Sequence, residues 1–166
     1  SEIRAITISA LAPRGGELLW DVGAGSGSVA VEWCQRHLRN RAVAFEAKPE
    51  RAERVKRNKL ELGGLSVEVI GEAPAGFVGR EAPDAVFIGG GLTEEGVFDA
   101  AWTALKPGGR LVANVVTIEG EAKLAALHAE HGGSLRRISI DRLAPVGGKH
   151  GWRPAMPVTQ WRVEKP

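Results

Sequence analysis

The chain has 166 residues, of which 43% are hydrophobic and 25% charged, so it is long enough to fold as one domain with its own core. No apolar run approaches the roughly 20 residues of a membrane span, and nothing at the amino terminus resembles a signal peptide. The single cysteine, Cys34, excludes a disulfide within one chain, and we expect a core thiol in a reducing cytoplasm.

The net charge of +2 conceals a basic segment in the last third of the sequence. Between Arg136 and Arg153, five cations stand against one acid, so the rest of the chain is acidic on balance. Such a local surplus favours an anionic partner over a general nucleic-acid surface, which would be more basic overall. Solvated charges that protect an edge strand would give the same pattern, and both interpretations stay open.

Taken in order, the chain opens with a predicted helix, because apolar residues recur at positions 3, 6, 10 and 11 before Pro13 and two glycines. The sequence starts without Met, and we expect residues 1–166 to be a single domain excised from a larger two-domain protein. An apolar run over residues 18–22 then predicts a buried strand that ends in Asp21-Val22.

A glycine-dense turn follows this strand at once, with Gly23, Gly25 and Gly27 at alternate positions. Apolar residues then recur at helical spacing, which predicts a strand, a tight turn and a helix. This unit holds a nucleotide-like ligand at the carboxyl end of a parallel strand, and the glycines let the backbone approach that ligand. We expect Ser26 or Ser28 to cap the helix.

Two acids indicate which ligand the turn binds. A dinucleotide fingerprint would have its third glycine where Ser28 stands. Asp21, two residues before the first glycine, instead suits the positive ammonium and sulfonium of S-adenosylmethionine. The next strand, over residues 42–46, ends in Glu46, whose carboxylate can accept both hydroxyls of a ribose. We therefore predict an S-adenosylmethionine site rather than a structural turn with two incidental acids.

The remaining segments alternate between helical and strand patterns. Pro49 opens a helix that we expect to run to Leu62 and end at Gly63-Gly64, and Thr93 is predicted to cap a later helix. Strands are predicted over residues 66–70, 84–88 and 111–116, a last helix around residues 121–131, and two long strands near residues 134–142 and 157–163. This order predicts an α/β fold with a doubly wound, mostly parallel, seven-stranded sheet and an antiparallel strand near its carboxyl-terminal edge.

Taken together, these motifs resemble those of class I S-adenosylmethionine-dependent methyltransferases, which have a Rossmann-like fold. Within that class they resemble the decarboxylating precorrin methyltransferases of cobalamin synthesis. The resemblance covers essentially the whole chain and rests on Asp21-Val22-Gly23-Ala24-Gly25-Ser26-Gly27, Glu46, Gly71-Glu72-Ala73-Pro74, Phe87-Ile88-Gly89-Gly90-Gly91, Leu105-Lys106-Pro107-Gly108-Gly109 and Leu111-Val112-Ala113-Asn114-Val115-Val116-Thr117. It implies methylation of a precorrin tetrapyrrole at carbon 15 and loss of carboxylate from the ring-C acetate at carbon 12. It also implies a carbon-5 methyltransferase domain in the same protein.

The resemblance assigns roles to individual residues. Glu46 would hold the ribose hydroxyls of S-adenosylmethionine, Ala47 would also contact the cofactor, and Glu72-Ala73 would meet the adenine. The methionine and ribose would be wrapped by the turn that follows Asp21, namely Gly23, Ala24, Gly25, Ser26 and Gly27.

The sequence departs from the family at two places. A Thr-Lys-type segment that precedes the position of Ser1 in the family is absent, and the family's Asn-Pro-Val reads Met156-Pro157-Val158 here. No role can therefore be transferred for that segment or for that Asn. The family also implies a homo-oligomer, a tetramer.

On the acceptor side, the loop Gly89-Gly90-Gly91 would let a flat macrocycle come close to the methyl group. The bridging carbon of a reduced tetrapyrrole is already nucleophilic, so alignment can supply much of the acceleration and no dedicated base is required. His150, in a predicted mobile loop over residues 147–153, is the candidate for proton transfer. The cations near this loop, Arg142, Lys149 and Arg153, are expected to bind substrate carboxylates.

Two other classes of function stay open. A fold does not fix its acceptor, so the substrate could be another small molecule or a tRNA, although the absence of Tyr argues against base stacking. The second alternative is a non-catalytic S-adenosylmethionine-binding module. We expect no metal site, because no ligand cluster has the required spacing, and neither a nucleic-acid nor a membrane partner.

Overall fold

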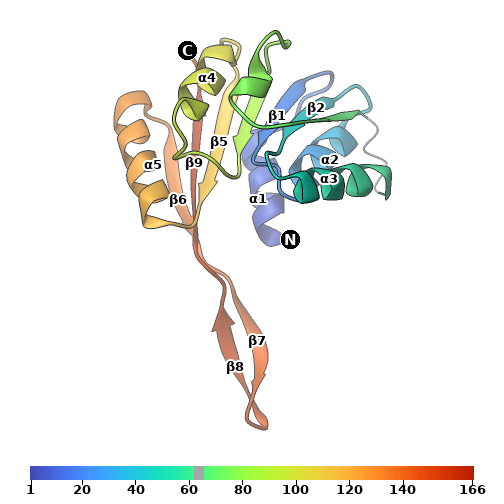
Figure 1. Cartoon of the computed structure of the whole chain (residues 1–166). Coiled ribbons are helices and arrows are strands. Elements are labelled where there is room, and N and C mark those ends of the chain that lie inside the picture. Colours follow the sequence, from blue (N-terminus) through green and yellow to red (C-terminus); the bar gives the residue numbers. More distant parts are fainter. Residues whose placement is uncertain (62–65) are drawn as a thin grey trace.

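A seven-stranded sheet runs through the body of the molecule (Figure 1). The computed structural model describes residues 1–61 and 66–166. The strand order is β3-β2-β1-β4-β5-β9-β6, and β9 is antiparallel to both of its neighbours while the other pairs are parallel. The strands are β1 (Leu18–Val22), β2 (Arg41–Phe45), β3 (Val67–Ile70), β4 (Ala85–Ile88), β5 (Arg110–Val115), β6 (Ser134–Ile138) and β9 (Val158–Glu164). The predicted fold class is confirmed.

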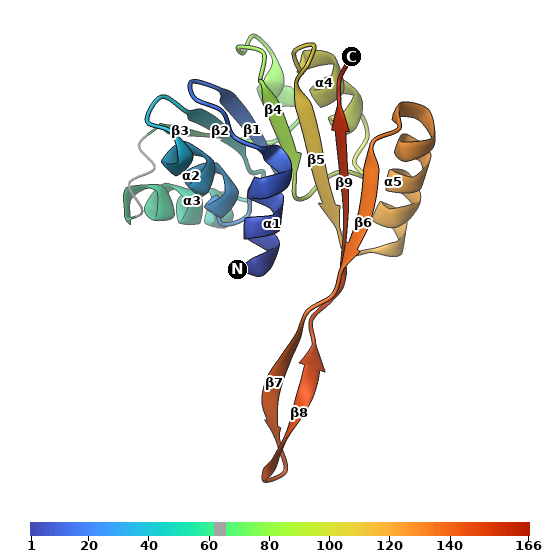
Figure 2. The same cartoon turned by 180° about the vertical axis from the view of Figure 1, so that it is seen from behind.

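Helices cover both faces of the sheet (Figure 2). One face carries α1 (Glu2–Leu11), α2 (Ser28–Arg36) and α3 (Pro49–Glu61), and the other carries α4 (Val97–Ala104) and α5 (Ile118–His131), with the short helix η1 (Ala75–Phe77). Each face has its own buried cluster, one around Trp20 and Trp161 and the other around Leu19 and Trp33. Every residue of β1 is buried because both faces are covered, which explains why four of its five residues are apolar and Asp21 is the exception.

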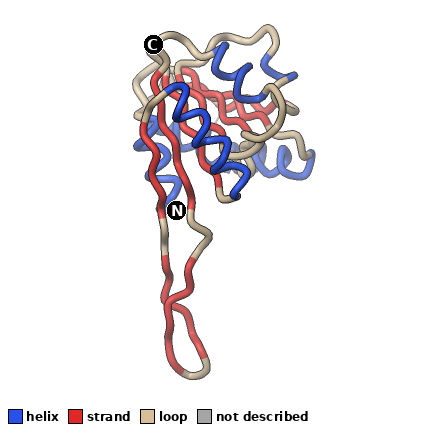
Figure 3. Tube along the Cα trace, turned by 90° about the vertical axis from the view of Figure 1, so that its left-hand side faces the viewer, coloured by secondary structure: helices blue, strands red, loops and turns tan. Residues whose placement is uncertain are grey.

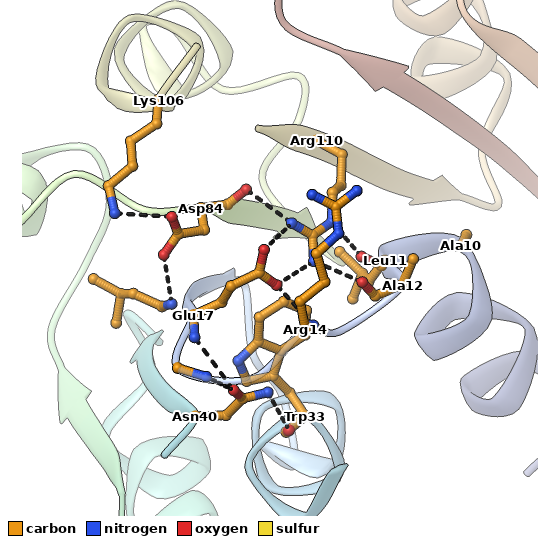
Figure 4. A network of polar contacts seen from close by, with 12 residues as sticks. Ala10, Leu11, Ala12, Arg14, Glu17, Trp33, Asn40, Asp84, Lys106 and Arg110 are labelled. Atoms are coloured by element: carbon orange, nitrogen blue, oxygen red, sulfur yellow. Dashed lines mark hydrogen bonds and ion pairs between the residues drawn. The ribbon is translucent and has the colours of Figure 1, made fainter. Parts of the chain in front are cut away.

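Arg110 links the end of α1 to the amino edge of the sheet, where the parallel strands begin, through hydrogen bonds of its side chain (Figure 4). Its side chain is 2% exposed and donates hydrogen bonds to both carboxylate oxygens of Glu17, at 2.8 and 2.5 Å. It also donates to the carbonyl oxygens of Leu11 and Ala12, which end α1. The far end of α1 consequently lies at the carboxyl edge of the sheet, where Ile3 lines a cavity.

The last third of the chain differs from the prediction in one respect. The strand expected over residues 134–142 ends at Ile138, and the chain then leaves the sheet as a hairpin of β7 (Asp141–Val146) and β8 (Lys149–Pro154). This hairpin projects away from the body of the molecule (Figure 3). The predicted mobile loop over residues 147–153 is therefore a tight turn at Gly147-Gly148, with φ of 48° and 75°, followed by a strand. Gly147-Gly148 favoured a loop in the sequence, whereas the structure uses these glycines as the turn between β7 and β8.

Three smaller predictions concern the end of one helix, the start of another and the burial of Cys34. The helix end expected at Leu62, Gly63 and Gly64 lies outside the described residues. The predicted cap Thr93 is wrong, because residues 92–96 form turns and α4 begins at Val97 after Gly96. Cys34 is half-buried and packs at the margin of a core cluster rather than inside it. Within residues 1–61 and 66–166, no helix is long and apolar enough to cross a membrane.

Candidate functional site

Two adjoining cavities open at the carboxyl edge of the sheet, where β1, β2 and β4 end. The smaller, of about 190 Å³, is lined by residues that include Glu46, Ala47 and Ala73. The larger, of about 520 Å³, is lined by Ala24, Gly25 and residues from α1, α2, β5 and β9. Both share the backbone of Gly23 and of residues 89–91. The carboxyl ends of parallel strands are where α/β sheets bind ligands.

Gly23 and Gly90 meet backbone to backbone at the boundary between the cavities. Gly23 has a φ of 67°, and a Cβ added to it would lie 2.6 Å from the carbonyl oxygen of Gly90. Only glycine therefore fits at position 23, both sterically and conformationally. A Cβ on Gly90 would instead meet nothing closer than 3.7 Å, so its own lack of a side chain keeps space open. This cradle suits a ligand that lies against the backbone, as the predicted cofactor would.

Glu46 is held rigidly at the wall of the smaller cavity. Its side chain is 6% exposed, its Oε2 accepts a hydrogen bond from the N–H of Gly25 at 2.9 Å, and its Oε1 accepts one from Lys48 at 3.0 Å. Each carboxylate oxygen has a second lone pair that these bonds leave available. The carboxylate is thus preorganised to accept further donors, such as a pair of hydroxyls.

Asp21 lies behind the glycine turn rather than in a cavity wall. It is fully buried, and its Oδ2 accepts a hydrogen bond from the N–H of Ala30 at 3.1 Å. Burial raises the pKa of Asp21 to about 7, the Ala30 N–H opposes this shift, and the charge of Glu46 adds to it. Oδ1 has no partner among the described residues. A buried carboxyl of this kind responds to a positive charge brought close to it.

The helix cap predicted for Ser26 or Ser28 is wrong. The N-cap position of α2 belongs to Gly27, with a φ of 70° and no side-chain cap bond, and Asp21 satisfies the first turn from nine residues earlier. The turn also packs on α3: a Cβ on Gly27 would lie 2.5 Å from Val55, and Asn58 donates to the carbonyl oxygen of Ser26 at 2.8 Å. Ser26 and Gly27 therefore shape the turn from behind.

The structure separates the residues predicted at the carboxyl edge from those on the hairpin. Ala24, Gly25, Gly89, Gly90 and Gly91 line the larger cavity, while Glu46, Ala47 and Ala73 line the smaller one. Glu72 is exposed beside Ala73. Lys149, His150 and Arg153 are exposed residues of β8, and His150 stands in a strand rather than in the mobile loop predicted for it. Arg142 donates to Glu2 in α1 at 2.7 Å.

Several residues of the cavities escaped the sequence-based prediction. Lys48, Arg51 and Glu94 line the smaller cavity, and Asn114 and Thr117 line the larger one. Asn114 could have been found, because it is a polar residue near the carboxyl end of a predicted buried strand. Residues 1–61 and 66–166 contain no group of three His, Cys, Asp or Glu side chains able to hold a metal ion.

Comparison with known proteins gives consistent matches. The family model described as "Precorrin methyltransferase domain" matches residues 1–165. A Sinorhizobium protein named precorrin-6Y C(5,15)-methyltransferase [decarboxylating] is 58% identical over 166 residues, which cover 99% of this chain and 40% of the relative. The cobalt-precorrin-6B C(15)-methyltransferase (decarboxylating) of Salmonella typhimurium is 32% identical over 162 residues, 94% of this chain and 83% of the relative.

Solved structures agree with these sequence matches. The C-terminal domain of precorrin-6Y C5,15-methyltransferase from Rhodobacter capsulatus superimposes with a TM-score of 0.92 at 44% identity, covering 99% of this chain and 89% of that one. The chain spans about two fifths of the length of the Sinorhizobium relative, and 42% of that of a Mycobacterium tuberculosis protein with the same name. The chain belongs to the precorrin methyltransferase family.

Proposed function

We propose that this chain methylates a precorrin at carbon 15 and removes the carboxylate of the ring-C acetate at carbon 12, with S-adenosylmethionine as the methyl donor. The observation that carries the proposal is the backbone contact between Gly23 and Gly90, which lies at the boundary between two cavities. The smaller cavity contains the carboxylate of Glu46, and the larger cavity is more apolar. The names of the Sinorhizobium and Salmonella relatives support this choice of substrate.

The residues fit the proposed cofactor. Glu46 would accept the ribose hydroxyls with lone pairs that Gly25 and Lys48 leave unused. The turn from Gly23 to Gly27 would hold the methionine part, and Glu72-Ala73 would lie beside the adenine. Ala47 would contact the cofactor from the wall of the smaller cavity, and Asp21 would balance the positive charge from behind. When bound, this cofactor supplies an electrophilic methyl group. The chain's residues bind it, orient it and keep water from it.

The loop at residues 89–91 would receive the acceptor. Because Gly90 carries no side chain and lines both cavities, a flat ring can approach the boundary between them. The acceptor carbon needs alignment rather than a base, so the absence of an ionisable side chain from this loop is no obstacle. Arg142, Lys149 and Arg153 would meet carboxylates at the rim of the macrocycle from the hairpin.

The proposal extends to partners. The hairpin exposes Leu143, Val146 and Trp152, with 60%, 60% and 72% of their surface open, and a homo-oligomer of the chain would cover them. The tetramer that the family resemblance implies is the basis for this expectation. A carbon-5 methyltransferase domain would account for much of the additional length of the Sinorhizobium relative.

The test is a product analysis. The chain is incubated with a precorrin intermediate that is not methylated at carbon 15 and with S-adenosylmethionine labelled at its methyl group, and the product is weighed and its label located. We expect a product that has gained a methyl group in place of a hydrogen and lost one carbon dioxide, with the label at carbon 15. Label at another atom, or binding of the cofactor without any transfer, would refute the proposal.

A further inference from the structure

The larger cavity has a wall without charge. It is lined by apolar side chains such as Ile3, Val29, Phe87 and Val158, and by the neutral polar side chains of Ser28, Thr93, Asn114 and Thr117. Among the described residues that line it, none is ionisable. The neighbouring smaller cavity is different, because Glu46, Lys48, Arg51 and Glu94 all line it. Charged side chains thus line the smaller cavity, and they are absent from the described residues that line the larger cavity on the other side of Gly23 and Gly90.

Asn114 provides a fixed, neutral donor in this uncharged wall. Its Nδ2 donates to Thr7 Oγ1 at 2.9 Å, and its Oδ1 accepts from Gln160 Nε2 at 2.9 Å. Thr7 and Gln160 are themselves fully buried, so the carboxamide cannot turn freely. The amide nitrogen has two hydrogens, and the bond to Thr7 uses one of them. The second can orient a carboxylate without neutralising its charge.

Building on the proposed function, we propose that the larger cavity takes up the ring-C acetate and that its uncharged wall promotes the loss of carbon dioxide. In this step the bond between the acetate methylene and its carboxyl carbon breaks. The bonding electron pair passes into the conjugated macrocycle, carbon dioxide leaves, and the methylene takes a proton from water to become a methyl group. The cavity supplies the environment for this step, and Asn114 acts as an orienting residue.

The physical reason lies in where the negative charge resides. In the bound substrate it is confined to two carboxylate oxygens, and a carboxylate taken from water without a cationic partner is destabilised. In the transition state the charge is already spreading into the ring, so the same surroundings raise its energy less. A cation in the wall would have the opposite effect, because it would bind the carboxylate and resist its loss.

The test introduces such a cation. Val158 opens β9, is half-buried and lines the cavity, so Val158→Lys adds an ammonium there while Val158→Met adds similar bulk without charge. Relative to Val158→Met, we expect Val158→Lys to bind the precorrin more tightly and to release carbon dioxide at least about tenfold more slowly in a single turnover. S-adenosylmethionine affinity, measured by calorimetry, should be equal in the two variants and reports that both are folded.

Other outcomes would refute the inference. Equal rates of carbon dioxide release, or slower release with weaker precorrin binding, would show that the acetate does not depend on an uncharged wall. If Val158→Lys fails to fold, Ile3→Lys against Ile3→Met makes the same comparison from α1. A failure of the proposed function is distinguishable, because the unaltered chain would then neither transfer methyl nor release carbon dioxide.

Discussion

The amino and carboxyl edges of the sheet are built in opposite ways. At the amino edge, Arg110 pairs with Glu17 and Lys106 with Asp84, and these side chains also bond the backbone of α1 and β1 (Figure 4). At the carboxyl edge, the buried Oδ1 of Asp21 is without a partner among the described residues, and glycine backbones leave cavities open. The charged side chains of the amino edge are thus paired with one another, whereas Oδ1 of Asp21 at the carboxyl edge is left available for a ligand.

The largest effect should follow from breaking the amino edge. Arg110→Met would leave Glu17 charged and largely buried, and we expect the free energy of unfolding to fall by about 3–5 kcal/mol in urea titrations. Arg41→Met is the matched control, because Arg41 and Glu81 form an ion pair that is about half exposed, at 51% and 52%. It should cost less than about 1 kcal/mol. An equal loss of unfolding free energy in the two variants would show that the buried Arg110–Glu17 pair stabilises the fold no more than an exposed pair does.

At the carboxyl edge, Gly90→Val should abolish methyl transfer and leave the fold intact. A Cβ at this position has room, but the branched side chain would fill the space for the acceptor. We expect turnover to fall at least about 100-fold, near 2.7 kcal/mol in activation free energy, while calorimetry finds cofactor affinity nearly unchanged. Gly15→Val, in the loop before β1 where a Cβ would meet only the ring of His37 at 3.8 Å, is the control. Surviving turnover in Gly90→Val would mean that the loop is only a turn.

Glu46→Ala tests whether the carboxylate of Glu46 binds S-adenosylmethionine. We expect S-adenosylmethionine to bind at least about tenfold more weakly, near 1.4 kcal/mol, because charge-assisted hydrogen bonds are lost. The comparison variant is Glu50→Ala on the exposed surface of α3, which should bind as the unaltered chain does. Unchanged calorimetric affinity in a folded Glu46→Ala variant would remove this residue from the site.

Asp21 gives the smallest effect, a dependence of affinity on pH. Its pKa is raised from 3.8 to about 7, so the folded state holds the proton more tightly than the unfolded state does. This carboxyl therefore lowers the free energy of unfolding as the pH rises from 3.8 to about 7. A cationic ligand favours the charged form, and we expect S-adenosylmethionine affinity to rise about fivefold from about pH 6 to pH 8. Asp21→Asn keeps an acceptor for Ala30 and should abolish the slope. Titrations in buffers of different ionisation heat should detect proton release only in the unaltered chain.

The parallel strands of the sheet were predictable because each of them carries its own pattern. The strand at residues 18–22 is buried on both faces, and the glycines after it fit a backbone that Gly90 approaches to within van der Waals contact. Glu46 was predictable for the same reason, since the end of a parallel strand fixes where its next side chain lies. Local rules were sufficient for these features.

Other features depend on partners distant in the sequence, and local patterns could not reveal them. The cap of α2 comes from Asp21 in the preceding strand, which made the adjacent serines the more obvious candidates. Leu143 and Trp152 have the apolar character of core strand residues, yet they are 60% and 72% exposed in the hairpin. The side chains that hold Asn114, from Thr7 and Gln160, lie 107 and 46 residues away. Only the assembled fold brings these groups together.

The place of β9 in the sheet has a consequence for how the protein is made. This strand is the last of the sheet in the sequence, yet it lies between β5 and β6, which pair with it and not with each other. During synthesis, β5 and β6 are made before β9. Their backbone N–H and C=O groups on the edge that faces β9 stay unpaired until β9 has been translated. Such edges invite pairing with other chains. A nascent chain paused before residue 158 would thus present two unpaired strand edges in this half of the sheet, whereas the half around β1 and β2 can already close.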